Sequence, residues 1–398
     1  MAVLTLDDLL AAPGGVRGRR VLVRADLNVP LKKGVIGDDT RIRASLGTLR
    51  RLLAGGARIA LTSHLGRPKG GPSAELSLAP VALRLAELLG RPVAFCAHTI
   101  GAEAAAAIAK LGDGEVVLLE NLRFDPREEQ NDVGFARALA ALADDYVNDA
   151  FGTAHRAHAS TAGIVPFVQR AAAGDLLRDE VRHLQVVREP ARPLLCLLGG
   201  AKVSDKLAVL EALAPHADVL AIGGAMAYTF LRALGQPTGA SLVEADRVGD
   251  AKRVIAAAER AGRTLLLPTD HVVAPKLEAD APAKVVETVP DGWMALDIGP
   301  VTARRYAEEA ARARTIFWNG PMGVFELEAF ARGTEAVARA VAASSAHSVV
   351  GGGDSLAAIN KLGLGDRIGH LSTGGGASLE FVQGLRLPGI AALEGRNA

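Results

Sequence analysis

The sequence predicts an α/β protein with two domains, each built on a parallel sheet that has helices on both faces. Short apolar runs alternate with longer segments of helical periodicity along the whole chain, a pattern typical of parallel strands joined by helices. The length of 398 residues at about 150 residues per domain gives two or three domains. One long amphipathic segment, residues 173–189, separates two regions of alternation. We therefore expect this segment to be a helix that joins the domains.

The first half of the chain supplies five expected strands and four expected helices. The strands are Arg20–Val23, Arg58–Thr62, Pro92–Phe95, Glu115–Leu119 and Asp145–Val147, and the helices are Arg41–Ala54, Leu78–Leu89, Ala102–Lys110 and Val133–Ala143. Gly55, Gly56 and Gly90 lie where the C-terminus of a helix favours glycine. Strands separated by helices of this length predict a parallel sheet with both faces covered.

The alternation resumes after the amphipathic segment, in which Leu177, Val181 and Leu184 are spaced as on one helix face. The strands expected here are Pro193–Leu198, Val219–Ile222, Thr264–Leu267, Met294–Ile298, Thr315–Trp318, Ser348–Val350 and Ile368–Leu371. Leu356–Lys361 and Ala377–Gln383 follow two of these strands and have helical patterns. In open α/β sheets, ligands bind at the carboxyl ends of the strands, so the loops there are the candidate sites.

Composition excludes several classes of protein. The net charge is +1, whereas proteins that bind nucleic acid or membrane surfaces usually carry a basic excess. Two cysteines, Cys96 and Cys196, cannot form a disulfide framework and indicate a reducing compartment. No signal peptide is visible in Met1–Leu10, and no uncharged run reaches the roughly 18 residues of a membrane span. We expect a soluble, cytoplasmic protein with no nucleic-acid or membrane partner.

Four loops of the second half follow expected strands and are rich in glycine. They are Gly199–Lys206, Gly223–Ala225, Gly351–Ser355 and Ser372–Gly376. Small residues at such turns let backbone N–H groups approach a phosphate. One loop of this kind is more often a tight turn than a site, but four at the edge of one sheet predict a polyphosphate site. None of them has the Gly-Lys-Ser/Thr of a Walker A loop, and no Gly-x-Gly-x-x-Gly opens a helix.

Three charged residues in these loops each have two possible roles. Lys202 and Lys206 are four residues apart, which would place both on one face of the first turn of a helix. They could contact phosphate, or both could be solvated surface residues. Asp354 could be the N-cap of the helix that follows it, or a carboxylate that holds Mg²⁺ beside phosphate-binding amides.

The corresponding loops of the first half carry basic residues. These loops are Arg24–Pro30, Ser63–Pro68, Glu120–Phe124 and Asn148–His158, and Arg41 opens a helix. A single arginine is most often a surface residue, but several at one edge of a sheet favour a small, highly charged anion bound by planar guanidinium groups. His155 and His158 could be metal ligands by their spacing, but no cysteine or carboxylate cluster completes a tetrahedral set.

Taken in order along nearly the whole chain, these motifs resemble the phosphoglycerate kinase family. The resemblance rests on Val23–Pro30, Ser63–Pro68, Glu120–Phe124, Asp149–His158, Gly199–Lys206, Trp318–Pro321, Gly323–Glu326, Gly351–Ser355 and Ser372–Gly376. It implies phosphoryl transfer between ATP–Mg²⁺ and the carboxylate of 3-phosphoglycerate, which gives ADP and 1,3-bisphosphoglycerate. It also implies a monomer with two Rossmann-like domains: a glycerate domain at 1–172, an interdomain hinge helix at 173–189 and a nucleotide domain at 190–386. The tail, 387–398, would fold back onto the first domain.

The resemblance also implies roles for individual residues. The glycerate would contact Asp26, Asn28, Arg41, His64, Arg67, Arg123 and Arg156. The nucleotide would contact Lys206, Gly223, Gly224, Ala295, Asn319, Glu326, Gly352, Gly353, Asp354 and Ser355, with Mg²⁺ on Asp354. Arg41, Lys202, Gly375 and Gly376 would act on the transferring phosphoryl group. Ala295 departs from the family pattern, because a glycine often touches the nucleotide there.

The chemistry is consistent with this set of residues. A glycerate carboxylate, with a pKa near ~3.5, is already ionised at neutral pH, so the acceptor needs no general base. The reaction needs positioning and cancellation of charge on the phosphoryl group. A nucleotide-dependent dehydrogenase would need the Gly-x-Gly-x-x-Gly fingerprint, which is absent. A non-catalytic relative would be expected to lack Lys202, Asp354 or Arg41, and all three are present.

Overall fold

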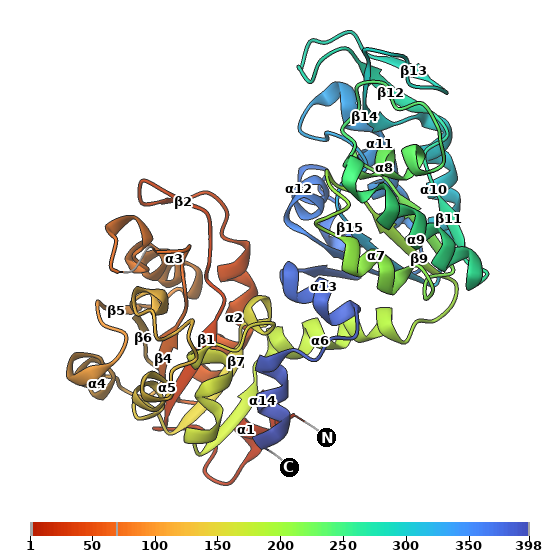
Figure 1. Cartoon of the computed structure of the whole chain (residues 1–398). Coiled ribbons are helices and arrows are strands. Elements are labelled where there is room, and N and C mark those ends of the chain that lie inside the picture. Colours follow the sequence, from red (N-terminus) through yellow and green to blue (C-terminus); the bar gives the residue numbers. More distant parts are fainter. Residues whose placement is uncertain (1–2, 69–70, 397–398) are drawn as a thin grey trace. The chain divides into compact units, whose positions relative to one another are not determined.

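The computed structural model describes residues 3–68 and 71–396, and it divides into two compact units (Figure 1). Unit 1 consists of Met1–Val181 together with Arg386–Ala398, and unit 2 consists of Arg182–Leu385. Helix α6 (Asp175–Arg188) contains the boundary between them. That the first unit binds the glycerate and the second binds the nucleotide stays a prediction. Met1, Ala2, Asn397 and Ala398, which the domain prediction included, lie outside the described residues.

Unit 1 is built on a six-stranded sheet in the order β5-β6-β4-β1-β7-β8, and every pairing in it is parallel. The strands are β1 (Arg20–Ala25), β4 (Arg58–Thr62), β5 (Ala94–Cys96), β6 (Val116–Leu119), β7 (Asp145–Asp149) and β8 (Arg170–Ala173). The central strand β1 is buried from Val21 to Ala25, as expected of a parallel strand covered on both faces. Sequence analysis predicted all of these strands except β8.

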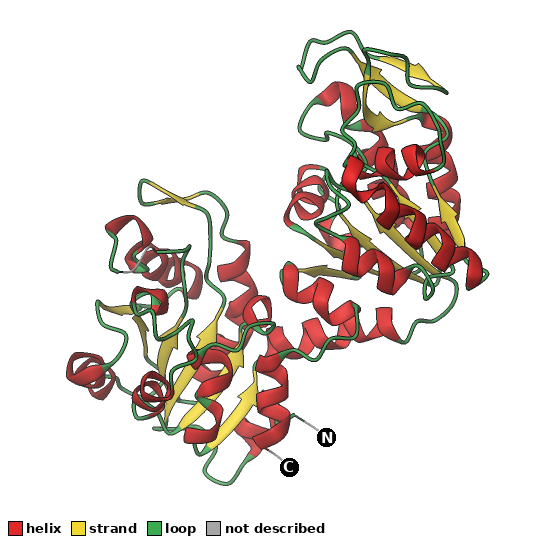
Figure 2. Cartoon of the chain, viewed as in Figure 1, coloured by secondary structure: helices red, strands yellow, loops and turns green. Residues whose placement is uncertain are grey.

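Helices cover both faces of this sheet (Figure 2). The main ones are α2 (Thr40–Ala54), α3 (Ala79–Leu89), α4 (Gly101–Ala109) and α5 (Val133–Ala140), all within the expected segments to a few residues. Helix α2 buries Ile42, Leu46 and Leu49, whose three- and four-residue spacing forms one apolar stripe. The short helix α1 (Leu6–Ala11) and the hairpin of β2 (Leu31–Lys32) and β3 (Val35–Ile36) were not expected.

The end of the chain packs on unit 1, as the fold prediction stated. Helix α14 (Pro388–Arg396) buries Ile390 and Leu393, which is 0% exposed. The Gly389 amide donates to the carbonyl of Ala154 over 2.8 Å. The two ends of the sequence therefore belong to one compact unit.

Unit 2 contains a second parallel sheet, in the order β11-β10-β9-β15-β16-β17. Its strands are β9 (Leu194–Leu198), β10 (Val219–Ile222), β11 (Thr264–Leu266), β15 (Thr315–Asn319), β16 (His347–Gly351) and β17 (His370–Ser372). Its helices are α7 (Leu207–Leu213), α8 (Met226–Ala233), α9 (Val248–Arg260), α10 (Pro300–Arg312), α11 (Arg332–Ala343), α12 (Gly353–Lys361) and α13 (Gly376–Val382). No helix of the described segments is both long and apolar enough to cross a membrane.

A small antiparallel sheet in unit 2 was not expected. It consists of β13 (Lys284–Val286), β12 (His271–Ala274) and β14 (Met294–Ile298), in that order. The expected strand at Met294–Ile298 therefore exists, but it belongs to this sheet and not to the parallel one. Its burial alternates along part of its length, in contrast to the continuous burial of β9 and β15, because the small sheet is not covered on both faces.

One buried carboxyl group in unit 1 makes folding depend on pH. Asp149, at the end of β7, is fully buried, and its Oδ1 accepts the amide of Leu176 over 3.0 Å. Its Oδ2 has no hydrogen-bond partner among the described residues. Burial raises the pKa of Asp149 to about 8. From about pH 4 to that value the folded state keeps a proton that the unfolded state has lost, so the free energy of unfolding falls as pH rises.

We expect Asp149→Asn to remove this part of the pH dependence. The amide oxygen can still accept from Leu176, and Nδ2 replaces the unpartnered Oδ2. The Tm of the variant relative to the wild type should rise between about pH 5 and pH 8. Asp144→Asn is the control: a hydrogen bond from Arg20 lowers the pKa of Asp144, so its Tm difference from the wild type should stay constant over that interval. Parallel Tm curves for Asp149→Asn and the wild type would contradict the assignment.

Candidate functional site

The basic loops of unit 1 leave one edge of the sheet side by side. Strands β6, β4, β1 and β7 are successive neighbours, and being parallel they end at the same edge. Asp26 and Asn28 follow β1, His64 and Arg67 follow β4, Arg123 follows β6, and Arg156 follows β7. Arg41 comes from the first turn of α2. The topology thus brings the seven expected glycerate contacts to one edge.

Arg41 is held by a buried carboxylate. Its Nη1 forms an ion pair with Oδ2 of Asp26, which is 5% exposed. The loop after β7 packs on this pair: a Cβ added at Gly152 would lie 2.3 Å from that Asp26 oxygen and 3.6 Å from Arg41 Nη1. Asp26 therefore positions the guanidinium, and the absence of a side chain at Gly152 leaves room for the pair.

His64 is a neutral hydrogen-bond donor in this site. It is 3% exposed, and its Nδ1 lies 3.3 Å from Nη2 of Arg24. Because an arginine can only donate, Nδ1 must accept, and the ring proton is therefore on Nε2. Burial lowers the pKa of His64 well below its ordinary value, and the charges of Arg24 and Arg123 add to this effect.

Arg24 belongs to a buried network that sequence analysis did not assign to the site. It is 0% exposed, and its Nε donates to Ser160 Oγ over 2.9 Å. The Ser160 hydroxyl and amide donate to the two oxygens of Glu128 over 2.5 and 2.9 Å. Burial raises the pKa of Glu128, although Arg24 opposes the shift. Ser160 and Glu128 lie in segments with no recognisable motif, so only the tertiary structure relates them to Arg24.

The remaining arginines differ in how they are held. Arg123 is buried, donates from Nη1 to Gly66 O over 2.8 Å and lies 3.1 Å from Glu129 Oε1. Asn28 Oδ1 accepts the amide of the same Gly66 over 2.8 Å, so both residues fix the turn before Arg67. Arg67 is exposed. Across residues 3–68 and 71–396, neither Arg67 nor Arg156 has a carboxylate within ion-pair distance. This edge therefore has uncompensated positive charge.

The loop after β7 contains two histidines, His155 and His158. Within the described segments, no three His, Cys, Asp or Glu residues lie together as a metal-binding group. His158 is buried beside Glu128, with Nδ1 3.8 Å from Oε1. Burial, and then the charges of Arg123 and Arg24, lower the pKa of His158 to about 4.

The glycine loops of unit 2 also leave one sheet edge together. Strands β10, β9, β15, β16 and β17 are successive neighbours, which confirms that the four loops belong to one sheet. Close backbone approach explains two of the glycines. A Cβ at Gly199 would lie 2.0 Å from Pro321 O. Gly224 has φ +66°, and its Cβ would lie 2.5 Å from Gly200 N. The amides of Gly199, Gly200, Gly223 and Gly224 donate to carbonyls of neighbouring strands and loops, whereas helices α12 and α13 begin within the other two loops.

Lys202 and Lys206 do not share a helix face. Helix α7 begins at Leu207, with Lys206 as its N-cap residue, and residues 203–206 form a turn before it, closed by the Lys206 amide donating to Val203 O over 3.0 Å. Glu244 explains the difference, because its carboxylate accepts the Ser204 amide over 3.0 Å and the Ser204 hydroxyl and so draws the segment out of the helix. Lys202 is exposed.

Lys206 is not a solvated surface residue, so this alternative from the sequence analysis is wrong for Lys206. Its Nζ donates to Gly199 O over 2.6 Å and to Asn319 O over 2.7 Å. Gly199 directly follows β9, and Asn319 is the last residue of β15. Burial lowers the pKa of Lys206 to about 8, although Asp354 opposes the shift. Lys206 therefore holds the carboxyl ends of β9 and β15 together.

Asp354 is not the N-cap of α12, which overturns the other alternative. The N-cap is Gly352, and Asp354 is the second residue of the helix. Its side chain is exposed, and it has no hydrogen bond or ion pair within the part of the chain that the structure describes. A single free carboxylate beside phosphate-binding amides fits Mg²⁺, which retains waters and takes one or two carboxylates together with phosphate oxygens.

The other residues of unit 2 that were expected in the site differ in burial. Ser355 and Asn319 are buried, and Ser355 Oγ accepts the Gly320 amide over 2.6 Å, so their side chains shape the loops. Gly375 and Gly376, which were expected to act on the transferring phosphoryl group, lie at the start of α13: Gly375 has φ +56° and directly precedes the helix, and Gly376 is its first residue. Glu326 is exposed in the loop after β15.

Ala295 lies in the small antiparallel sheet, on β14, and is 5% exposed; its amide donates to Ser241 Oγ over 3.0 Å. The loop after β15 is joined to this strand, because the Val324 amide donates to Leu296 O over 2.8 Å. The small antiparallel sheet therefore lies beside the loop that contains Glu326, another expected nucleotide contact.

Comparisons with a family model, with curated relatives and with solved structures all match this chain to one family. The family model described as phosphoglycerate kinase matches residues 12–385. Curated relatives named phosphoglycerate kinase include one from Moorella thermoacetica, 58% identical over 99% of both chains, and one from Rubrobacter xylanophilus, 57% identical over 96% of this chain and 97% of that one. The solved phosphoglycerate kinase of Coxiella burnetii has a TM-score of 0.89 at 42% identity, covering 100% of both chains. That of Pyrococcus horikoshii has a TM-score of 0.87 at 34% identity, covering 99% of both.

Proposed function

This chain belongs to the phosphoglycerate kinase family, and on that premise we propose that unit 1 binds the glycerate and unit 2 binds the nucleotide. The activity is the reversible transfer of a phosphoryl group between ATP and the carboxylate of 3-phosphoglycerate, which gives ADP and 1,3-bisphosphoglycerate. The observation that carries the assignment is the contrast between the two sheet edges. One has two arginines, Arg67 and Arg156, without carboxylate partners in the described segments, and the other has glycine-rich loops in which helices α12 and α13 begin.

The edge of unit 1 suits a small anion. Arg67 and Arg156 provide charge that no described carboxylate compensates, and buried Arg123 fixes the turn before Arg67. Neutral His64 donates from Nε2 and so can bind an oxyanion without a change in protonation. Asp26 accepts hydrogen bonds and can also hold a glycerate hydroxyl. We assign the glycerate to Asp26, Asn28, Arg41, His64, Arg67, Arg123 and Arg156.

The edge of unit 2 suits a nucleotide. Polyphosphate binds where backbone N–H groups converge at a helix N-terminus, and α12 begins within such a loop. We assign the nucleotide to Lys206, Gly223, Gly224, Ala295, Asn319, Glu326, Gly352, Gly353, Asp354 and Ser355. Mg²⁺ held by Asp354 would neutralise phosphate charge.

The chain's own residues act by positioning and by charge. A carboxylate oxygen of 3-phosphoglycerate attacks the γ-phosphorus of ATP, and the bond from that phosphorus to the β,γ-bridging oxygen breaks. The acceptor is already ionised, so no residue has to remove a proton. Arg41, Lys202 and the amides of Gly375 and Gly376 stabilise the charge spread over the transferring group. Closure of the units about α6, a monomeric state and a cytoplasmic location stay predictions.

Removal of one unit 1 arginine tests the assignment of substrates to units. Arg67→Ala should raise the KM for 3-phosphoglycerate about ten- to a hundredfold, because it removes a charge-assisted contact of roughly 1.5–3 kcal/mol. The KM for ATP should change little. A coupled assay with ATP, Mg²⁺, 3-phosphoglycerate, NADH and glyceraldehyde-phosphate dehydrogenase measures both constants.

Arg91→Ala is the matched control, since Arg91 is an exposed arginine of unit 1 that donates to Gly114 O. Neither KM should change in that variant. If Arg67→Ala raised the KM for ATP and left that for 3-phosphoglycerate unchanged, the substrates would have to be exchanged between the units.

A further inference from the structure

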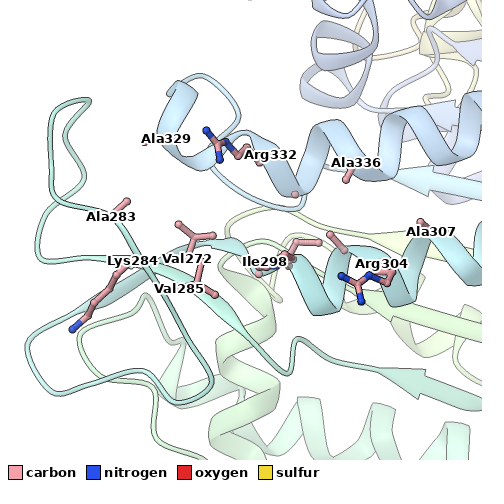
Figure 3. Close-up of a pocket in the computed structure, with 14 residues that line it drawn as sticks. Val272, Ala283, Lys284, Val285, Ile298, Arg304, Ala307, Ala329, Arg332 and Ala336 are labelled. Carbon is pink, nitrogen blue, oxygen red and sulfur yellow. The ribbon is translucent and has the colours of Figure 1, made fainter.

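Unit 2 contains a cavity that the assigned residues do not line. It has a volume of about 640 Å³ and lies between helices α10 and α11, beside β12 and β13 (Figure 3). None of the residues assigned to the glycerate, the nucleotide or the transferring phosphoryl group is among its lining residues. The size is in the range of small-molecule sites, about 300–1,000 Å³.

The walls of the cavity are apolar. Ile298 lies at the end of β14, Ala303 and Ala307 lie on α10, Ala336 lies on α11, and Val272 lies on β12. Alanine at three positions on the two helices leaves space that longer side chains would fill. An aliphatic chain placed here would lose its contact with water, which is favourable by about 25 cal/mol per Å² of buried apolar area.

Carboxylates lie at the N-termini of both helices, but they are occupied. Asp270 accepts the amides of Val301 and Thr302 over 2.9 and 2.8 Å at the start of α10. Asp297 accepts the amide of Gly333 over 2.6 Å at the start of α11. Both carboxylates are buried. The helix termini are therefore already capped and contribute no free donors to the cavity.

Two arginines at the cavity have no counterion. Arg304 lines it from α10 and Arg332 lines it from α11, as Figure 3 shows, and both are exposed. In the described part of the chain neither forms an ion pair, whereas Arg312 on α10 pairs with Glu309 and Arg339 on α11 pairs with Glu335.

Lys284, the third cation at the cavity, is engaged elsewhere. Its Nζ lies 3.9 Å from the ring centroid of Trp293, and in Figure 3 the side chain points away from the two helices. The positive charge available to a bound molecule is therefore that of Arg304 and Arg332, one from each helix.

From these contacts we propose that the cavity binds a small amphiphilic carboxylate. The aliphatic part lies against the alanines, Ile298 and Val272, and the carboxylate is attracted by the positive charge of Arg304 and Arg332, either of whose planar guanidinium groups can bind it. A neutral molecule of the same shape leaves both arginines unpaired. A short carboxylate leaves the apolar walls exposed to water. The site therefore requires both parts of the ligand.

Isothermal titration of the full chain with decanoate tests the proposal. We expect one saturable site per chain with decanoate, affinity at least about tenfold lower for 1-decanol, in line with a lost charge-assisted hydrogen bond, and no binding of acetate. The double variant Arg304→Glu, Arg332→Glu should lose decanoate binding. Ala307→Trp, which fills the cavity, should lose it as well.

Arg305→Glu is the matched control, because Arg305 is the next residue on α10 and is exposed but does not line this cavity. It should bind decanoate like the wild type. Circular dichroism and the coupled assay report whether each variant is folded; if Ala307→Trp does not fold, the arginine double variant still decides. Absence of saturable binding, equal affinity for decanoate and 1-decanol, or equal losses in Arg305→Glu and the double variant would overturn the proposal.

Discussion

Arg41→Ala is expected to lower kcat by about 10³- to 10⁵-fold, the range known for arginines that stabilise a transferring phosphoryl group. Arg41 is the one assigned glycerate contact that comes from a helix and is also paired with a buried carboxylate, Asp26. Such a guanidinium is preorganised, so it stabilises charge that develops in the transition state without first being reoriented. The coupled assay at saturating ATP and 3-phosphoglycerate measures the loss.

Two variants on the same helix serve as comparisons. Arg43→Ala removes an exposed arginine that pairs with Asp39, and it should keep kcat near the wild-type value. Arg41→Lys keeps the charge but loses the planar fork, so it should recover only part of the activity. An Arg41→Ala enzyme with normal kcat and a raised KM for 3-phosphoglycerate would limit Arg41 to binding.

Lys202→Met should lower kcat by about 10²- to 10³-fold and change both KM values much less, since a group that acts on the transition state contributes little to ground-state binding. Lys202 is exposed and directly precedes the turn in which Ser204 donates to Glu244. Unlike Lys206, which donates to two strand-end carbonyls, it has no hydrogen bond or ion pair in the described segments. Its amine is therefore available to the phosphoryl group. Steady-state kinetics in both substrates give the comparison.

Lys252→Met provides the control for loss of one lysine from unit 2, because Lys252 is exposed on α9. It should leave kcat unchanged. Equal losses in kcat and in the affinity for either substrate would make Lys202 an ordinary binding residue. A smaller decrease in kcat in Lys202→Met than in Lys206→Met would indicate that Lys206, which donates to two backbone carbonyls, contributes more to the rate than Lys202 does.

The parallel sheets could be predicted from sequence because their strands are buried on both faces and are continuously apolar. Strands β8 and β13, which were not predicted, lack this signal. β8 is Arg-Ala-Ala-Ala, a sequence equally compatible with a helix, and β13 has two exposed residues out of three. Strand β14 was predicted but assigned to the wrong sheet, since pairing partners are set by contacts distant in sequence.

The candidate site could be predicted to the level of its loops, because strand ends fix where loops emerge. The hydrogen-bond partners of individual side chains could not be predicted. The carbonyl acceptors of Lys206 Nζ, the capping role of Gly352 in place of Asp354, and the Arg24–Ser160–Glu128 network all depend on atoms from separate segments. No local pattern contains that information.

The packing of α14 has a consequence for biosynthesis. Unit 1 needs Leu393 and its neighbours at the far end of the chain to complete its core, whereas unit 2 is one continuous segment, Arg182–Leu385. A ribosome that synthesises the chain from its N-terminus therefore delivers every residue of unit 2 before the last helix of unit 1. Domains commonly fold in the order of synthesis. Here the unit that is started first is the one that must wait for α14, which is translated after all of unit 2, and the apolar surface that receives α14 is left open to chaperones in the meantime.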